Sequence, residues 1–562
     1  MTYNMKLVFT FWACSLLCFH TASAQTTDLR TALDAFFQKA ADNGYSGSVL
    51  VAHKGAVLLE KGYGMQDPEA NKAQQAETVF SIGSITKQFT AAAILKLEDQ
   101  GKLSVQDPLS KYFPDAPAER KNITLHQLLT HSAGFPGAIG DDYELPATAE
   151  FVQQAFASEA LFPPGTGYEY SNVGYSLLGI VIEKVSGKTY EQYLHDNLWL
   201  PAGMIKTGYL LPGHKPAALA VGYRDGQRWG TALDRPWGPD GPGWHLKANG
   251  GVLSTVGDMY RWYEALLTDK VLSATARTKY FTKHVLEGNG QTHYGYGWVV
   301  MDHPDFGRQI WHNGGNGVYN AFMGFSPDTK TCIIVSSNTN QKISDDYALV
   351  VSNMLVGKHT PLSDATLQRW SGHYQLPDGT GFDLRFNELD HALIEVNSPA
   401  LFTCLIGNGD ENPAEMAALT ARVKTAVEQL AAGQYAPFAE LRQAPEAMVR
   451  RNQSAAWEEF RRDWGAFKGV EALGSAARPR MNAQLTMLKL NFERQAPIFT
   501  YIWRDGMIDD FHSEPNLVKA FEPDGEGRFL ARSNNLALVF PADGGLLLEQ
   551  NGKQVRAEKR KK

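Results

Sequence analysis

The stretch that decides the fold is Phe80–Asp107, FSIGSITKQFTAAAILKLEDQGKLSVQD. It contains a Ser-x-x-Lys pair, Ser84 and Lys87, followed by the apolar, alanine-rich run Phe89–Leu97. Such a run predicts a helix that is buried on most of its sides, and Gly101 predicts where it ends. The pattern therefore places Ser84 on the first turn of a buried helix.

Ser84 and Lys87 have the spacing of an activated serine nucleophile. Residues three apart share one face of a helix, so the lysine amine can reach the serine hydroxyl. Partial burial disfavours the charged form of a lysine, which makes Lys87 a usable base. The first turn of a helix also offers backbone N–H groups to a developing anion. A surface serine and lysine on an ordinary helix would match this short motif equally well.

Composition and charge restrict the class of protein. A chain of 562 residues with 43% hydrophobic and 20% charged residues is expected to form about two to four globular domains. The formal net charge of −7 gives no argument for a nucleic-acid partner or an anionic membrane surface. The basic end Lys559–Lys562 is interpreted as solvated.

The N-terminus has the three parts of a secretory signal peptide. Lys6 precedes the apolar run Leu7–Phe19, and Ala22-Ser23-Ala24 is a small-x-small cleavage site. The run is short for a membrane span. We therefore expect a signal peptide over residues 1–24 and a periplasmic or secreted protein, with an uncleaved anchor as the alternative. No later stretch is apolar and long enough for a membrane span.

After cleavage only two of the four cysteines would remain, Cys332 and Cys404. Two buried thiols in apolar strands are expected, rather than a disulfide framework or a metal site. A structural zinc site would need clustered histidines and cysteines, and the sequence has no such cluster. We therefore expect neither a metal nor an organic cofactor.

Hydrophobic patterns divide the chain into regions. Residues 29–357 begin and end with strand-like runs that enclose helices, which predicts one mixed α/β domain. After it, short alternating runs predict a small antiparallel β domain, split into 362–406 and 515–558. The intervening residues 407–514 contain two helical segments and a hairpin, which predicts an α+β insertion.

A second candidate element is Tyr170-Ser171-Asn172, which follows the loop Pro163-Pro164-Gly165. A phenol close to a lysine can take or pass a proton, and an asparagine side chain can hold a substrate amide. Taken alone, a core tyrosine with a turn asparagine would explain this tripeptide as well.

The third element is His312-Asn313-Gly314, which we expect at the start of a strand. Glycines let the backbone approach a substrate, and the N–H of Gly315 would complete an oxyanion hole with that of Ser84. His53-Lys54-Gly55 matches the same pattern, but there a tight hairpin turn explains it. With an unperturbed pKa of about 6.5, His312 is expected to be mostly neutral at pH 7.5 and to gain charge at lower pH.

Longer motifs occur in a fixed order: FSIGSITKQFTAAAILKLEDQGKLSVQDPLSKYFPD, ITLHQLLTHSAGFPG, FPPGTGYEYSNVGYSLLGIVIEKVSG, NGGVLSTVGDMYRW and HNGG. Together they resemble the serine β-lactamase-related hydrolases, which include class C β-lactamases, penicillin-binding-protein-like D-Ala-D-Ala carboxypeptidases, D-aminopeptidases and esterases. The resemblance covers roughly Leu29–Gly357. It implies an α+β, β-lactamase/transpeptidase-like fold, with an antiparallel sheet flanked by helices, a helical lobe and the site between them. The end of the chain is similar to the small lipocalin-like β-barrel domains that follow some members.

The resemblance also implies roles for the candidate residues. Ser84 would be the acylated nucleophile, Lys87 its base partner and Tyr170 the general base and acid. The substrate-binding residues would be Asn172, His312, Gly314 and Gly315, with His312 at a position that many members fill with lysine.

The expected function is that of an exported serine hydrolase. It would cleave an amide or ester in a small molecule or short peptide, through a Ser84 acyl-enzyme: a D-amino-acid peptide, a carboxylic ester or a β-lactam. The alternative is a catalytically silent peptidoglycan- or β-lactam-binding protein on the same fold. The joint presence of serine, lysine, tyrosine and asparagine argues against this alternative. The substrate, the fate of β-lactams, the oligomeric state and the role of the insertion stay open.

Overall fold

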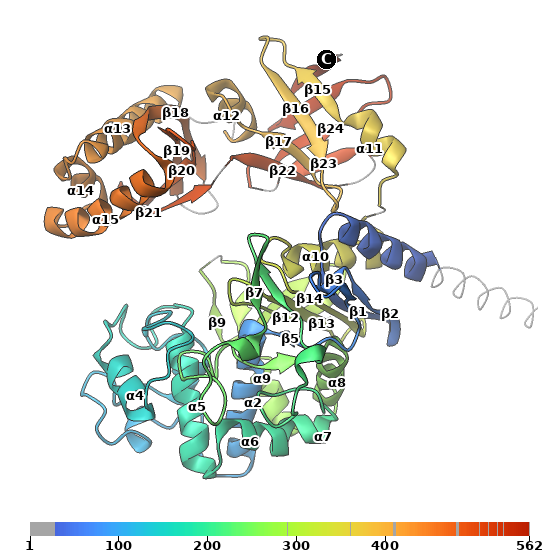
Figure 1. Ribbon diagram of the computed structural model, residues 1–562, viewed down its shortest axis with the longest axis vertical. Coiled ribbons are helices and arrows are strands. Elements are labelled where there is room, and N and C mark those ends of the chain that lie inside the picture. Colours follow the sequence, from blue (N-terminus) through green and yellow to red (C-terminus); the bar gives the residue numbers. More distant parts are fainter. Residues whose placement is uncertain are drawn as a thin grey trace, which may run out of the picture. The chain divides into compact units, whose positions relative to one another are not determined.

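The computed structural model describes residues 28–288, 290–359, 361–407, 412–478, 483–504, 506–514, 516–524, 527–531 and 533–560. The expected signal peptide, residues 1–24, lies outside the described residues. The chain divides into two compact units, Met1–Gly357 and Lys358–Lys562 (Figure 1). No helix in the described ranges is both long and apolar enough to cross a membrane.

An eight-stranded antiparallel sheet forms the centre of the first unit. Its strands, in sheet order, are β2 (Ala56–Tyr63), β1 (Gly47–His53), β14 (Thr331–Ser337), β13 (Asn320–Ser326), β12 (Gly307–Gly315), β11 (Val299–His303), β10 (His293–Tyr294) and β9 (Val285–Leu286). Because β1 pairs with β14, strands from the beginning and the end of the unit lie side by side in the sheet. Three short pairs complete the strands: β3 (Met65–Asp67) with β4 (Lys72–Ala73), β5 (Phe80–Ser81) with β8 (Leu253–Ser254), and β6 (Gly222–Arg224) with β7 (Gln227–Gly230).

Helices cover both faces of this sheet (Figure 1). The helical elements are residues 28–42, η1 (Gly83–Ile85), α2 (Thr86–Asp99), η2 (Leu109–Lys111), α3 (Leu125–Leu129), α4 (Thr148–Ala157), α5 (Asn172–Ser186), α6 (Tyr190–Leu194), η3 (His195–Trp199), α7 (Leu200–Ala202), η4 (Pro216–Ala218), η5 (Ala232–Asp234), α8 (Val256–Leu266), α9 (Ala274–Tyr280) and α10 (Ser344–Leu355). On one face, Leu50 and Ile334 join the core formed with α2 and α8. On the other face, Phe37 of the first helix stacks on Tyr63 of β2 and Tyr347 of α10. This is the β-lactamase/transpeptidase-like arrangement expected from the sequence, and that prediction is confirmed.

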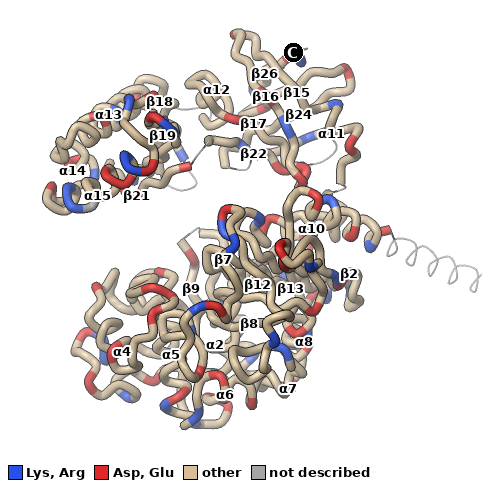
Figure 2. Tube along the Cα trace, viewed as in Figure 1, with Lys and Arg blue, Asp and Glu red and all other residues tan. Residues whose placement is uncertain are grey.

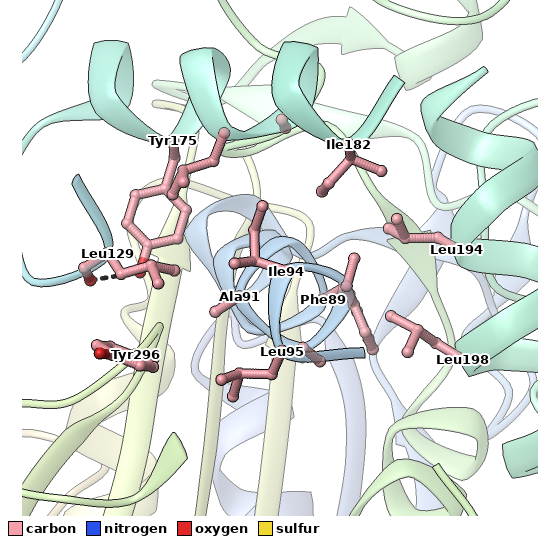
Figure 3. Packing of buried hydrophobic residues seen from close by; sticks show 14 of the residues in the cluster. Phe89, Ala91, Ile94, Leu95, Leu129, Tyr175, Ile182, Leu194, Leu198 and Tyr296 are labelled. Carbon is pink, nitrogen blue, oxygen red and sulfur yellow. Dashed lines mark hydrogen bonds between the residues drawn. The ribbon is translucent and has the colours of Figure 1, made fainter. Parts of the chain in front are cut away.

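Helix α2 lies in the middle of the main core and is buried along almost its whole length. Figure 3 shows Ile94 of α2 pointing toward α5, which contributes Tyr175 and Ile182, and Phe89 of α2 beside Leu194 and Leu198. Full burial of one such apolar side chain contributes about 1.5–3 kcal/mol to folding. The Tyr175 hydroxyl donates a 2.8 Å hydrogen bond to the carbonyl oxygen of Leu129, which ties α5 to the end of α3. The helix that carries the candidate lysine is therefore held on all sides.

The second unit contains a closed antiparallel barrel, as the fold prediction states. Its strands, in barrel order, are β15 (Gly372–Gln375), β16 (Gly381–Phe386), β17 (Ala392–Glu395), β22 (Val518–Pro523), β23 (Arg528–Ala531), β24 (Leu536–Val539), β25 (Leu546–Gln550) and β26 (Lys553–Arg560). In the sequence, helix α11 (Asp364–Trp370) precedes β15 and helix α12 (Pro399–Leu405) follows β17. The last strand, β26, pairs with β15 and closes the barrel, so the basic end is part of a strand up to Arg560.

Between β17 and β22 the chain forms a second sheet with its own helices. The elements are α13 (Pro413–Ala431), α14 (Ala436–Arg442), α15 (Glu446–Trp464), β18 (Phe467–Arg478), β19 (Ala483–Phe492), β20 (Ile498–Arg504) and β21 (Met507–Glu514), and the strands pair in this order. The expectation of two helices and a hairpin was wrong in number, because α14 is short and the second half of β18 contains a run of small residues, Gly474–Ala477, with no apolar alternation. Among the described residues Cys332 and Cys404 are free thiols, but Cys404 is only partly buried and lies on α12 and not on a strand.

We expect a chain that ends at Gly357 to fold and to keep Ser84 reactive. The first unit has its own core, and the cut falls just after α10, which packs on β13 and β14. All seven candidate site residues lie before the cut. Circular dichroism would report folding, and labelling with a fluorescent serine-reactive probe would report reactivity, with Ser84→Ala in the same short chain as the control. A folded short chain that takes up no label would place an essential residue beyond Gly357.

Candidate active site

The backbone around Ser84 is shaped by a glycine. Ser84 is half-buried in η1, a single 3₁₀ turn that leads directly into α2, so the helix proper begins two residues later than the first turn predicted from sequence. The preceding Gly83 has φ +53°, and a Cβ there would lie only 2.4 Å from the amide nitrogen of Gly315. Only glycine fits this turn without strain. The turn brings Ser84 against the end of β12.

Lys87 is completely buried and contacts three oxygen atoms. Its Nζ lies 3.1 Å from Ser84 Oγ, 2.7 Å from Asn172 Oδ1 and 2.9 Å from the backbone oxygen of Asn249. The side-chain amide nitrogen of Asn249, Nδ2, donates to Ser176 Oγ and to the backbone oxygen of His245. These two hydrogen bonds hold Asn249 in place beside Lys87. None of the three oxygens carries a charge, so no hydrogen-bonded anion holds the lysine in its ammonium form.

This environment determines the protonation of Lys87. Burial lowers the pKa of Lys87 well below its usual value, and the carboxylate of Asp142 opposes that shift only in part. A neutral amine has two N–H groups and one lone pair. Asn172 Oδ1 and the Asn249 carbonyl can only accept, so they take the two N–H groups. The lone pair is then left for the hydroxyl hydrogen of Ser84, which is the arrangement that a general base needs.

Tyr170 faces the same two residues. Lys87 Nζ lies 4.6 Å from the centre of the Tyr170 ring. The phenol oxygen is buried and makes no well-aligned hydrogen bond within the described part of the chain, although Ser84 lies close enough to lower its pKa. Burial is the larger influence and raises the pKa of Tyr170 above its ordinary value. Tyr170 therefore rests as a protonated phenol.

Asn172 is the first residue of α5. The preceding Ser171 caps this helix, since its hydroxyl accepts from the N–H of Gly174. That hydroxyl also donates to the carbonyl of Pro136, and the N–H of Asn172 donates to the carbonyl of Gly137. The loop after α3 therefore sets the direction in which Asn172 reaches Lys87.

Gly314 and Gly315 end β12 beside the serine turn. A Cβ on Gly314 would lie 2.0 Å from the carbonyl oxygen of Ile82 and 2.8 Å from the amide nitrogen of Ser84. No larger residue could bring the strand this close to the nucleophile. The backbone amides of Ser84 and Gly315 are therefore neighbours, as an oxyanion hole requires.

His312 lies in the second half of β12, and not at a strand start as predicted. Its ring is almost fully buried, with Nε2 at 3.0 Å from the Tyr294 hydroxyl and Nδ1 against the carbonyl oxygen of Asn313. The carbonyl can only accept, so Nδ1 carries the hydrogen and Nε2 accepts from Tyr294. Burial and the nearby Lys87 lower the pKa of His312 to about 3. The expected gain of charge at mildly acidic pH was therefore wrong.

We expect His312→Lys to shift selectivity toward substrates that carry a carboxylate. In the wild type the neutral imidazole should give a selectivity that stays constant from pH 5.5 to 8.5, because a pKa of about 3 lies outside that range. A lysine here would add a cation and should raise the carboxylate-to-ester ratio of kcat/KM by about tenfold at pH 7.5. His53→Lys, at the end of β1, is the matched control and should leave the ratio unchanged. A ratio that His312→Lys does not move would show that this position does not sense substrate charge.

The structure brings together all seven residues predicted for the site, and adds three that sequence reasoning missed. Asn249 holds Lys87 through a backbone oxygen, and it begins the motif NGGVLSTVGDMYRW, a signal that sequence reasoning did not use for this residue. Tyr294 orders His312 from β10, and its surroundings in the sequence give no signal. His131 lies in the motif ITLHQLLTHSAGFPG, which was a signal that sequence reasoning did not use.

No group of three or more histidine, cysteine, aspartate or glutamate side chains in the described ranges is placed to hold a metal ion. Figure 2 shows basic and acidic residues interspersed along the chain of each unit.

Comparisons with known proteins agree with this geometry. The family model described as Beta-lactamase matches residues 33–353, which is more than half of the chain. A penicillin-binding protein of Bacillus subtilis is 27% identical over 377 residues, which cover 60% of this chain and 80% of that protein. The same bacterium's PbpX, named as a penicillin-binding protein, is 32% identical over 295 residues, 52% of this chain and 71% of its own.

A solved structure also resembles the chain over nearly its whole length. The octameric penicillin-binding protein homologue from Pyrococcus abyssi has a TM-score of 0.54 and 22% identity, and the match covers 93% of this chain and 99% of that one. At this identity the likeness concerns the fold alone. The family match rests on the first unit, where the Ser84, Lys87 and Tyr170 cluster lies. The chain belongs to the Beta-lactamase family, and both of the Bacillus subtilis relatives named above are described as penicillin-binding proteins.

Proposed function

We propose that this protein is an exported serine hydrolase that cleaves an amide or ester through an acyl-enzyme on Ser84. The observation that carries the proposal is the bonding of Lys87: a buried lysine whose partners are two carbonyl oxygens and the serine hydroxyl. A neutral amine satisfies all three partners, whereas an ammonium would be buried with no anion among its hydrogen-bond partners. This arrangement favours transfer of the Ser84 hydroxyl proton to Lys87 Nζ.

In the first half of the reaction, Ser84 Oγ would form a bond to the substrate carbonyl carbon while its proton moves to Lys87 Nζ. The carbonyl oxygen would become an oxyanion, bound by the N–H groups of Ser84 and Gly315. The amine or alcohol would leave as its bond to the carbonyl carbon breaks. It would take up a proton from Tyr170, whose raised pKa keeps the phenol protonated and able to donate. Lys87 would then return the proton to Tyr170.

In the second half, water would attack the acyl carbon and release Ser84. Lys87 and Tyr170 would take the proton from the water and return one to Ser84 Oγ, so that no net proton is left on the enzyme. The rate of this half decides whether β-lactams are hydrolysed or only acylate the serine. A stable acyl-enzyme would instead support the alternative function, a silent peptidoglycan- or β-lactam-binding protein on the same fold.

The charges near the serine favour uncharged acyl groups. His312 is neutral with both ring nitrogens engaged, so it offers no cation to a substrate carboxylate. The half-buried Asp142 adds negative charge near Lys87. We propose carboxylic esters and D-amino-acid amides or peptides as substrates, ahead of acids with a free carboxylate. Asn172 would orient the substrate amide once the reaction shifts Lys87 away from it.

One screen of the purified protein tests the proposal. It would use a fluorescent serine-reactive probe, p-nitrophenyl esters, D-amino-acid anilides and a chromogenic cephalosporin. We expect the probe to label the protein and at least one ester or anilide to be turned over. Labelling without turnover would favour the silent binding protein, and no labelling at all would exclude Ser84 as an activated nucleophile. Fractionation of an expressing bacterium, with the cleaved N-terminus sequenced, tests the proposed export and the processing before Gln25.

A further inference from the structure

The loop that follows α3 contains a histidine with an unusual conformation. His131 has φ +58°, a left-handed backbone that only a few per cent of non-glycine residues adopt. Its side chain is only 1% exposed. A strained residue in this position persists only where its surroundings hold it, and such residues gather at functional sites.

His131 binds the chain on both sides of Tyr170. Its backbone oxygen accepts a 3.0 Å hydrogen bond from the N–H of Glu169. Its Nδ1 accepts a 2.9 Å hydrogen bond from the N–H of Ser171. The left-handed backbone allows one residue to offer both acceptors to the same short segment. Tyr170 is therefore held between two hydrogen bonds that end on a single residue.

The imidazole ring also packs against the phenol itself. The ring centres of His131 and Tyr170 are 4.4 Å apart, with 38° between the planes. Tyr294, which bonds to His312, lies 4.5 Å from the same imidazole. The ring thus forms one wall of the space in which Tyr170 sits, and links it to the end of β12.

The hydrogen bonds fix the protonation of His131. Because the N–H of Ser171 points at Nδ1, that nitrogen holds a lone pair and the hydrogen is on Nε2. Nε2 is buried and has no hydrogen-bond partner among the described residues. Burial is the main cause that lowers the pKa of His131 well below its usual value, and the nearby basic groups of Lys87 and His312 act in the same direction. The titratable groups that face the ring are Lys87, Tyr168, Tyr170, Tyr175, Tyr294 and His312.

We propose that His131 is a positioning residue, which fixes Tyr170 and Asn172 relative to Lys87 by binding the chain before and after Tyr170. The inference rests on the proposed function, since it concerns the acylation of Ser84. A neutral imidazole whose accepting nitrogen is occupied cannot take a proton from the reaction. Its contribution is therefore geometric, as is that of a residue that orients a ligand of a metal site.

Two substitutions that both tolerate a positive φ test this role. His131→Asn keeps an acceptor close to the Nδ1 position, whereas His131→Gly removes it. We expect His131→Gly to lower the rate of Ser84 acylation by about 10- to 100-fold, and His131→Asn to remain within about fivefold of the wild type. The pH profile of acylation should keep its shape in His131→Asn, because Lys87 and Tyr170 still carry the protons. Circular dichroism and thermal melting check that both variants fold.

Each contrary result has a distinct meaning. A folded His131→Gly protein within about threefold of the wild type would overturn the positioning role. An equal loss of acylation rate in both variants, with an altered pH profile of acylation, would show that the imidazole itself transfers a proton. If His131→Gly fails to fold, ¹⁵N-histidine NMR of the wild type provides the test, and the His131 signal is identified by its absence from the spectrum of His131→Asn. We expect this signal to show the neutral imidazole protonated at Nε2 from pH 5.5 to 8.5. An imidazolium signal in this range would contradict the proposal. Failure of the proposed function is separate, because then the wild type would be labelled no better than Ser84→Ala.

Discussion

Ser84→Ala should abolish covalent labelling and lower kcat by about 10⁴-fold or more, while the protein stays folded. The substitution removes the only atom that can form the acyl bond, so the remaining rate would come from substrate binding and the oxyanion hole. The cost to stability should be small. Ser84 is half-buried, and the hydroxyl makes one hydrogen bond with Lys87, worth about 1 kcal/mol.

The measurement is burst and steady-state kinetics with a p-nitrophenyl ester, together with mass spectrometry of the labelled protein. Ser81→Ala is the matched control, because Ser81 is a buried serine three positions earlier, on β5, with no contact to Lys87. It should keep both label and turnover. Unchanged turnover in folded Ser84→Ala would remove the basis of the whole assignment.

The parts of the site that sequence could predict are those built from local spacing. Ser84 and Lys87 lie three residues apart, so any helix over this stretch brings them together. The apolar run that follows them predicts that this helix is buried. Gly314 and Gly315 are the last two residues of β12, where glycines indicate a close approach of two backbones, and the structure places that approach at the serine turn.

The parts that could not be predicted depend on contacts between distant residues. The base strength of Lys87 depends on the carbonyl of Asn249, 162 residues away, and a backbone oxygen has no sequence signature. The burial of His312 and its hydrogen bond with Tyr294 are tertiary features that the sequence does not show. For this reason His312 was expected to titrate near its unperturbed pKa. Strand β26, KQVRAEKR, buries only one residue fully, Ala557, so no alternation marks it, and only the closure of the barrel makes it a strand.

Lys87 and Tyr170 should lose activity as a unit. Both residues are needed to carry the same proton between Ser84 and the leaving group. Removal of the second residue should therefore cause little further loss of activity once the first has been removed. We expect Lys87→Ala and Tyr170→Phe each to lower kcat/KM by about 10³-fold or more, and the double variant to be about as slow as the slower single one. Lys87→Met, which keeps most of the buried volume, would separate loss of the base from loss of packing.

A neighbouring tyrosine provides the control for this double-mutant cycle. The Tyr175 ring also lies near Lys87 Nζ, at 5.7 Å, but its hydroxyl is bound to the carbonyl of Leu129 and faces away from the proton path. Tyr175→Phe should therefore reduce activity modestly, and its loss should add to that of Lys87→Ala. If the Lys87 and Tyr170 losses multiplied in the same way, the two residues would act in separate steps. The neutral amine beside Ser84 would then be sufficient as the base for acylation, and Tyr170 would serve only the leaving group.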